Sequence, residues 1–163
     1  DADKLKMMKD TVAKHFNALM TVFDFYANLG GNNPFQMSLN AFSSCLEECS
    51  IPDNESLYCK KSDCDTLFIV SRAGFVEKGS KLQKMKDENC LLRFEFFDVM
   101  IRIAMAKISK VLPDVNPAEA LDMLVEQVIL PNCHPLARVD RDFFRVNRFY
   151  NEEMDLLLRK HVS

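Results

Sequence analysis

The sequence lacks several of the residues on which particular folds and activities depend. Its 163 residues contain no tryptophan, only 4 glycines and only 3 histidines. So few glycines disfavour a turn-rich β-sandwich and any glycine-rich phosphate-binding loop. No apolar run approaches the roughly 20 residues that a membrane-spanning helix needs. The formal net charge of −3 argues against a nucleic-acid-binding protein, whose domain would be strongly basic. We therefore expect neither a nucleic-acid partner nor membrane insertion.

The composition instead favours a folded helical domain. Hydrophobic residues make up 48% of the chain, which is enough apolar material to bury a core. Phenylalanine and methionine are frequent, at 13 and 9 residues, a combination that suits helix-lined cores or surfaces that repack around partners. The chain begins at Asp1 in a charged stretch without the apolar core of a signal peptide. We expect a cut fragment or a processed product, cytoplasmic and without enzymatic activity.

Apolar residues recur every three or four positions along most of the chain, which is the spacing of amphipathic helices. The pattern predicts helices at 4–29, 38–49, 62–74, 91–112, 117–129, 138–146 and 151–158. The polar stretch at 77–90 is expected to contain a mobile loop. Its lysines are Lys78, Lys81, Lys84 and Lys86. No strand of any length is predicted, so the expected fold class is all-α.

Three stretches share one pattern, in which an apolar residue is followed four positions later by an acidic or small residue and then by another apolar residue. The three sets are Met37, Ala41 and Phe42, then Leu91, Glu95 and Phe96, and finally Phe149, Glu153 and Met154. Calcium-binding helix–loop–helix units have the same order. Their apolar residue at loop position eight pairs two loops through a short β-bridge, and their glutamate at position twelve binds the ion with both oxygens.

The stretch 91–108, which opens with LLRFEFFDVMIRIA, resembles the outgoing helix of an EF-hand in the calmodulin-like superfamily. In that register the loops are 30–41, 84–95 and 142–153. The resemblance implies one EF-hand pair in residues 1–112 and a further helix–loop–helix unit, 113–163, packed on it. It also implies a short β-bridge near Met37 and Leu91, which a purely helical scaffold would lack. With ILPN and FYNEEMD later in the chain, the stretch is also similar to EF-hand-like domains of ciliary and protist cytoskeletal proteins.

The loops depart from the pattern that calcium binding requires. Oxygen ligands are needed at positions one, three and five. The second loop has Lys84 and Lys86 at positions one and three, where ammonium groups would repel the ion. The first loop lacks the carboxylate at position twelve, and the third has Asp142 and Glu153 at its ends but apolar residues at positions three and five. We expect no loop to bind calcium tightly, with Glu95 an exposed glutamate in the first turn of its helix.

Two alternatives remain open at this point. In the first, the protein is a calcium sensor whose third loop binds the ion weakly through Asp142, Glu153 and backbone carbonyls. In the second, it is a structural domain held together by zinc, since thiolates are zinc ligands. The candidate zinc ligands are Cys45, Cys49, Cys59 and Cys64. Against zinc, two of them fall on the apolar stripe of helix 38–49, where a reduced cysteine behaves as a small hydrophobe.

Catalytic chemistry has little support. Cys133 and His134 are adjacent in a proline-flanked loop, but neighbours in sequence seldom point at each other, so a reactive dyad is not expected. His15 is next to Phe16 on the first helix and is expected at the boundary of the core.

Arginines recur at three- and four-residue steps near the C-terminus. They are Arg138, Arg141, Arg145 and Arg148. On one helix they would form a basic stripe that suits an acidic partner, or a solvated face balanced by neighbouring acidic residues.

The residues therefore predict a protein-interaction module that works without calcium. An EF-hand pair without ions can still form a cup lined by phenylalanine and methionine, in which an amphipathic helix of a partner lies. The candidate groove residues are Phe23, Phe42, Phe68, Phe96, Met100 and Ile103. The expected partner is a helical or acidic segment of another protein, and the second resemblance places the module in a cytoskeletal or ciliary assembly.

Overall fold

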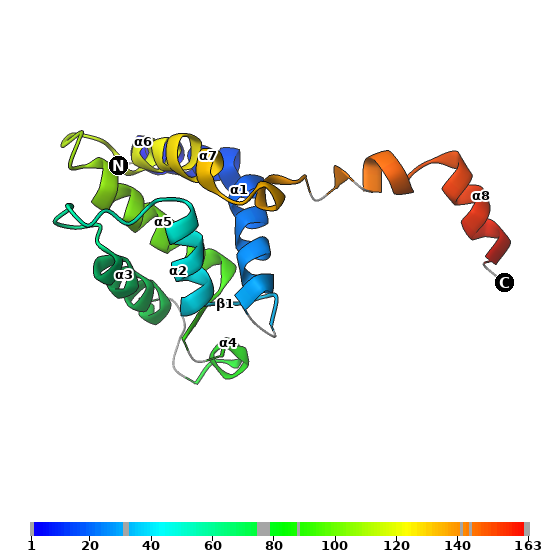
Figure 1. Ribbon diagram of the computed structural model, residues 1–163, viewed down its shortest axis with the longest axis horizontal. Coiled ribbons are helices and arrows are strands. Elements are labelled where there is room, and N and C mark those ends of the chain that lie inside the picture. Colours follow the sequence, from blue (N-terminus) through cyan, green and yellow to red (C-terminus); the bar gives the residue numbers. More distant parts are fainter. Residues whose placement is uncertain are drawn as a thin grey trace.

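The computed structural model describes residues 2–30, 33–74, 79–87, 89–140, 142–143 and 145–161 (Figure 1). The fold class is all-α, as predicted. The α-helices are α1 (Ala2–Gly30), α2 (Leu39–Glu48), α3 (Lys61–Gly74), α4 (Lys81–Met85), α5 (Arg93–Ile108), α6 (Pro117–Met123), α7 (Leu130–Asn132) and α8 (Glu152–His161). Wider π-turns form η1 (Leu124–Ile129) and η3 (Arg145–Phe149), and a tighter 3₁₀ turn forms η2 (Pro135–Arg138).

Two helices begin as their sequences dictate. The Asn116 side chain accepts hydrogen bonds from the backbone N–H groups of Ala118 and Glu119, and Pro117 occupies the first turn of α6. At α2, the hydroxyl of Ser38 accepts the N–H of Ala41 at 3.3 Å. Each cap satisfies backbone donors that have no partner inside the helix.

A two-stranded antiparallel ribbon joins the loops that precede α2 and α5. Strand β1 (Met37–Ser38) pairs with β2 (Cys90–Leu91), with Met37 opposite Leu91. Both of these side chains are fully buried. The predicted short bridge is therefore present at the predicted residues, and the prediction that no longer strand occurs holds for the described part of the chain.

One hydrophobic core lies between α1, α2, α3, α5 and the α6–η1 segment. The hydroxyl of Tyr26 links α1 to two other segments. It donates a hydrogen bond to Glu48 at the end of α2, at 2.7 Å, and accepts one from the backbone N–H of His134 at 3.3 Å. Leu121 and Val125 enter the same core as Phe23, so the chain on either side of residue 112 shares one core. Only the last part of the predicted C-terminal unit stays outside, since α8 has no buried residue and lies away from the body (Figure 1).

The predicted helix at 138–146 is wrong. The structure has the 3₁₀ turn η2 before it, extended backbone at Val139, and the π-turn η3 from Arg145. The three arginines and two phenylalanines in this stretch have helical spacing, but spacing alone gives little stability to a short helix.

Candidate functional site

A buried ion pair closes the loop that precedes α5. The Lys86 ammonium lies 2.5 Å and 2.6 Å from the two carboxylate oxygens of Glu95. It also donates to the backbone carbonyl of Arg72, at the end of α3, at 3.3 Å. The Lys86 side chain is 8% exposed and that of Glu95 is 0% exposed. The three N–H donors of the ammonium group thus have three acceptors, as a buried charge requires.

Glu95 is held in place by the start of its own helix. One of its carboxylate oxygens accepts the backbone N–H of Leu92, the N-cap residue of α5, at 2.8 Å. A negative charge in the first turn is also stabilised by the positive end of the helix dipole. The carboxylate therefore faces back into the loop, where Lys86 reaches it.

Asn89 shapes the same loop and connects it to the ribbon. Its φ of 58° is in the left-handed region, which a β-carbon normally disfavours and which asparagine tolerates. Its carbonyl accepts the N–H of Leu39, and its side-chain oxygen accepts a guanidinium N–H of Arg72 at 2.8 Å. In the 84–95 register Asn89 is position six, where EF-hand loops usually have glycine because the turn is sharp.

Two expectations for this loop are corrected by these contacts. Glu95 is not an exposed glutamate but a buried one, and Lys86 is not part of a mobile polar surface but the partner of that carboxylate. The sequence carried a signal for the pair, namely a lysine at position three opposite a glutamate at position twelve. Lys81 and Lys84 are exposed, but they lie on the short helix α4 rather than in the predicted loop, and Lys78 lies outside the described residues.

In the first loop, the residues at positions one and twelve pack directly on each other. A β-carbon added to Gly30 would overlap the methyl group of Ala41. No space for a cation separates these positions, and neither residue has an oxygen-bearing side chain. Together with the ammonium group in the second loop, this means that the residues of these two loops do not fit calcium.

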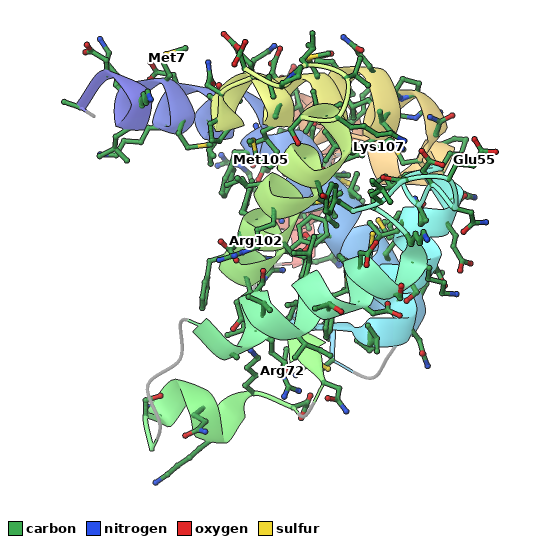
Figure 2. All side chains as sticks on the ribbon, turned by 90° about the vertical axis from the view of Figure 1, so that its left-hand side faces the viewer. Met7, Glu55, Arg72, Arg102, Met105 and Lys107 are labelled. Atoms are coloured by element: carbon green, nitrogen blue, oxygen red, sulfur yellow. The ribbon has the colours of Figure 1, made fainter. Side chains whose placement is uncertain are left out.

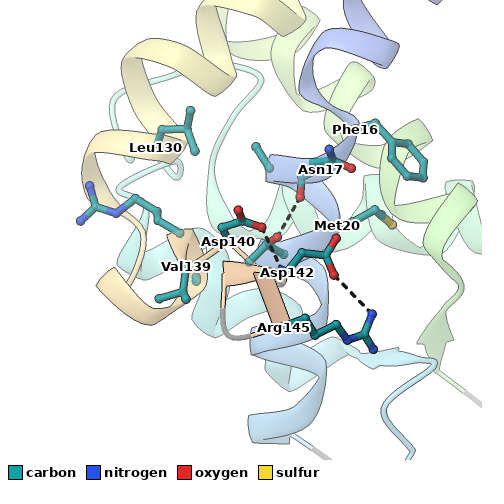
Figure 3. A pocket seen from close by; sticks show the side chains of 12 residues that line it. Phe16, Asn17, Met20, Leu130, Val139, Asp140, Asp142 and Arg145 are labelled. Carbon is teal, nitrogen blue, oxygen red and sulfur yellow. Dashed lines mark hydrogen bonds and ion pairs between the residues drawn. The ribbon is translucent and has the colours of Figure 1, made fainter. Parts of the chain in front are cut away.

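The third candidate loop does not form a calcium site either. Asp142 binds the guanidinium of Arg145 at 3.3 Å beside a hollow of about 770 Å³ against α1 (Figure 3). Glu153 is exposed in the first turn of α8. Between them, Arg145–Phe149 form the π-turn η3 rather than an ion-binding loop, and Phe144, at position three of the candidate loop, lies outside the described residues.

The six candidate groove residues are core residues. Their exposed fractions are 0–1% for Phe23, Phe42, Phe68, Phe96, Met100 and Ile103. Phe42 packs against Phe68 and Phe23 against Phe96, with ring centroids 5.2 Å and 5.4 Å apart. In this conformation no partner reaches them, because each interior face is already covered by another helix.

The predicted basic stripe is not assembled on one helix. Arg138 ends η2 and Arg145 begins η3, so the two belong to different elements. Arg145 is exposed and pairs with Asp142. Arg141 and the side chain of Arg148 lie outside the described residues.

The four candidate zinc ligands form two pairs instead of one cluster. A hydrogen bond between Cys45 and Cys49, followed by burial, raises the pKa of the Cys45 thiol. A hydrogen bond from Cys64 lowers the pKa of Cys59, while that bond and burial raise the pKa of Cys64. All four thiols are free and buried. Among the described residues, the one grouping with metal-ligand spacing contains no cysteine, so a four-thiolate zinc site is not formed.

That grouping is His15, Asp122 and Glu126, where α1 meets α6 and η1. His15 is 2% exposed, and its Nε2 lies 2.7 Å from Asp122. Lys14 already lies between the carboxylates, 2.6 Å from Asp122 and 3.3 Å from Glu126. The hydrogen bonds from Lys14 and then His15 lower the pKa of Asp122. The cluster thus links α1 to α6 and η1, and the Lys14 ammonium occupies the place that a metal ion would take. The sequence analysis missed it because its members are about a hundred residues apart.

Cys133 and His134 do not form a reactive dyad. The His134 ring stacks on Phe25, with centroids 4.7 Å apart, and its Nδ1 accepts the N–H of Leu136 at 3.2 Å. The Cys133 thiol points to the carbonyl of Leu130, and burial raises its pKa.

No helix in the described part of the chain is long and apolar enough to cross a membrane. Comparisons of the chain with protein-family models, with curated proteins and with solved structures gave no match.

Proposed function

We propose that this chain is a protein-interaction module of EF-hand-like construction that works without calcium and binds an amphipathic helical segment of a partner. The observation that carries the proposal is the Lys86–Glu95 pair. An ammonium group holds both oxygens of the carboxylate that would bind calcium, so the loop has its own cation. The module would act in the cytoplasm, in a cytoskeletal or ciliary assembly.

Three further features support the EF-hand-like part of the proposal. The ribbon pairs Met37 with Leu91, which are the position-eight residues of the two loops. Asn89 has a left-handed backbone at position six. Glu95 caps the outgoing helix from position twelve. These features depend on the loop register and not on calcium ligands. A loop with this register can therefore keep its geometry without a bound ion.

Calcium titration tests the first half of the proposal. Native mass spectrometry of the chain with and without calcium should give the same mass, and calcium should leave the melting temperature unchanged. A calcium adduct that resists mild chelation, or a calcium effect that Glu153→Gln removes, would overturn the proposal in favour of a sensor.

Restoring the ion ligands tests the register itself. In the variant Lys84→Asp/Lys86→Asp, positions one, three and twelve all carry carboxylates, and Asn89 keeps the sharp turn. We expect this variant to be destabilised without calcium and to recover stability when calcium is added, measured by circular dichroism during heating. The matched control adds Glu95→Gln and should lose that recovery. A variant indifferent to calcium would contradict the EF-hand register.

The binding half is tested with a defined probe. A synthetic amphipathic peptide with leucine at positions i, i+3 and i+7 and glutamates on its flanks should bind equally with calcium or with a chelator present, measured by isothermal titration calorimetry. A scrambled peptide of the same composition is the control. If neither peptide binds, or if binding requires calcium, the module does not work as proposed.

A further inference from the structure

The core-facing stripe of α1 continues beyond the body that it covers. From Leu19 onward this face is buried, but its first half carries apolar side chains at the same spacing that are exposed at Leu5 and Phe16 and only partly buried at Met8 and Val12. These are Leu5, Met8, Val12 and Phe16, and the Phe16 ring stacks on Phe97 of α5 with centroids 5.6 Å apart. We call the four residues on α1 the overhang face. Figure 2 shows the first turns of α1, marked by Met7, projecting past α5.

The overhang face is hollowed and accessible. A depression of about 560 Å³ follows α1, and Met8, Val12 and Phe16 line it. The Phe16 side chain is 49% exposed and that of Leu5 is 58% exposed. Apolar side chains at three- and four-residue steps along such a hollow are what the apolar face of another helix fits.

The chain also has a helix, α8, whose apolar face is uncovered. On α8, Met154, Leu157 and Leu158 share one face at positions i, i+3 and i+4, yet no residue of α8 is buried. Leu157 and Leu158 are 49% and 45% exposed. A ten-residue helix is marginal in water by itself, because isolated helices below about 12–15 residues lack the stability that packing supplies. Helix α8 therefore requires packing of its apolar face against another surface to be stable.

The charge of the first turn of α8 is complementary to that of the first half of α1. Of its three acidic residues, Asp155 pairs with Arg159 of the basic last turn, so Glu152 and Glu153 give this end of α8 its negative charge. The exposed side of the first half of α1 has three lysines, Lys4, Lys6 and Lys9. Opposite charges around an apolar contact favour encounter and fix its register more than they add affinity.

We propose that the overhang face receives helix α8 of a second copy of this chain, so that two copies exchange their C-terminal helices. In the structure Val139, Asp140, Asp142 and Arg145 still border the hollow against α1, but beyond them the chain leads away from the body, and α8 lies apart from α1 of its own chain (Figure 1). The overhang face of a second copy can contact α8 in its present position. Docking of α8 on its own chain requires the segment before α8 to turn back toward α1. Reciprocal exchange covers both unpartnered faces at once in a two-fold dimer. The inference rests on the proposed function, since it names the partner of the interaction module.

The first experiment is light scattering of the full chain over a range of concentrations. We expect a mass twice the 18.8 kDa of the chain at high concentration. The variant Leu157→Glu/Leu158→Glu should halve that mass, and it should leave the fold intact because α8 contributes nothing to the core. Leu156→Glu is the matched control, since this side chain is 52% exposed on the opposite face of α8 and should leave the dimer unchanged.

A mixing experiment decides between exchange and other arrangements. Val12→Glu damages the overhang face and leaves α8 intact, while the α8 variant does the reverse. Each alone should be monomeric, whereas an equal mixture should associate, because one intact face meets one intact helix. The circular dichroism spectrum of Val12→Glu checks its fold, and Leu5→Glu, on the outermost turns, is the second variant if it unfolds.

Three outcomes would overturn the proposal. A wild-type chain that is monomeric at all concentrations, with α8 protected from hydrogen exchange, means that α8 docks on its own chain. A monomer with unprotected α8 means that the overhang face receives no α8. A dimer that survives Leu157→Glu/Leu158→Glu has a different interface. The proposed function fails separately, through calcium binding or through loss of binding to the amphipathic peptide probe.

Discussion

The Lys86 and Glu95 side chains form a buried ion pair, a contact with a high desolvation cost. Removing two charges from water costs several kcal/mol per ion, and their attraction offsets this only when the remaining hydrogen-bonding groups are also satisfied. That condition is met by the carbonyl of Arg72 and the N–H of Leu92. A buried pair of this kind specifies one loop conformation, because any other arrangement leaves a buried charge without a partner.

Lys86→Met should destabilise the protein by about 3–5 kcal/mol, since it leaves a buried carboxylate uncompensated. Chemical denaturation at neutral pH measures the change. Lys84→Met is the control, because Lys84 is exposed in the same segment, and it should change stability by about 0.5 kcal/mol or less. Equal effects of the two variants would show that the ion pair contributes nothing beyond an ordinary surface lysine.

Asp122 makes stability depend on acid pH. Its pKa is lowered from an ordinary 3.8 by Lys14 and His15, so the folded state holds its proton less tightly than the unfolded state. The stabilisation is present above pH 3.8 and is lost as the pH falls through the lower pKa of the folded state. Asp122→Asn should cost about 1 kcal/mol or less at pH 5, because the side chain is two-fifths exposed and screened. The difference from wild type should shrink as the pH falls below 3.8 in urea titrations, and a constant difference would contradict this origin.

Helices α1 and α2 touch where α1 ends. Gly30 ends α1 against Ala41 in the first turn of α2, and nothing larger than a hydrogen fits between them. This contact sets how the chain turns from α1 into β1, because the end of α1 and the start of α2 are fixed to each other across the loop. Ser38 caps α2 beside the same contact.

Gly30→Ala should destabilise the protein by about 1–3 kcal/mol, because an overpacked contact forces backbone to move. Gly74→Ala is the matched control: a β-carbon at the end of α3 meets nothing within 4 Å, and alanine favours helix. We expect that variant to be neutral or slightly more stable. Thermal melts of both variants provide the comparison, and a Gly30→Ala protein as stable as wild type would mean that α2 shifts freely.

At the scale of the whole molecule, the core joins α1, α2, α3 and α5 with α6 and η1 and ends before α8. Residues suggested as a binding cup are what this core is made of, so their substitution acts on folding. An accessible binding surface must therefore lie outside the core, as the proposed overhang face on α1 does.

Phe96→Ala should cost about 3–5 kcal/mol, since a fully buried ring is replaced by a cavity. Phe94→Ala, two residues earlier on the same helix and 44% exposed, should cost clearly less. Denaturant midpoints of the two variants measure the difference. Comparable midpoints would place Phe96 in a surface groove after all.

The sequence by itself determined the all-α class, the extent of most helices and the pairing of Met37 with Leu91. Each depends on periodicity or on the local register of a loop, which neighbouring residues encode. The helical spacing at 138–146 predicted a helix where the structure has the turns η2 and η3, because spacing alone does not stabilise a short helix.

Only the tertiary structure decided which polar residues are buried. Glu95 and Lys86 look like ordinary surface residues in the sequence, and His15 and Asp122 are 107 positions apart. Burial of a charge depends on which elements close over it and on whether a partner arrives from another part of the chain. The same holds for the overhang face, because the stripe on α1 is uniform in sequence and only the packing of α5 and α6 determines where its cover ends.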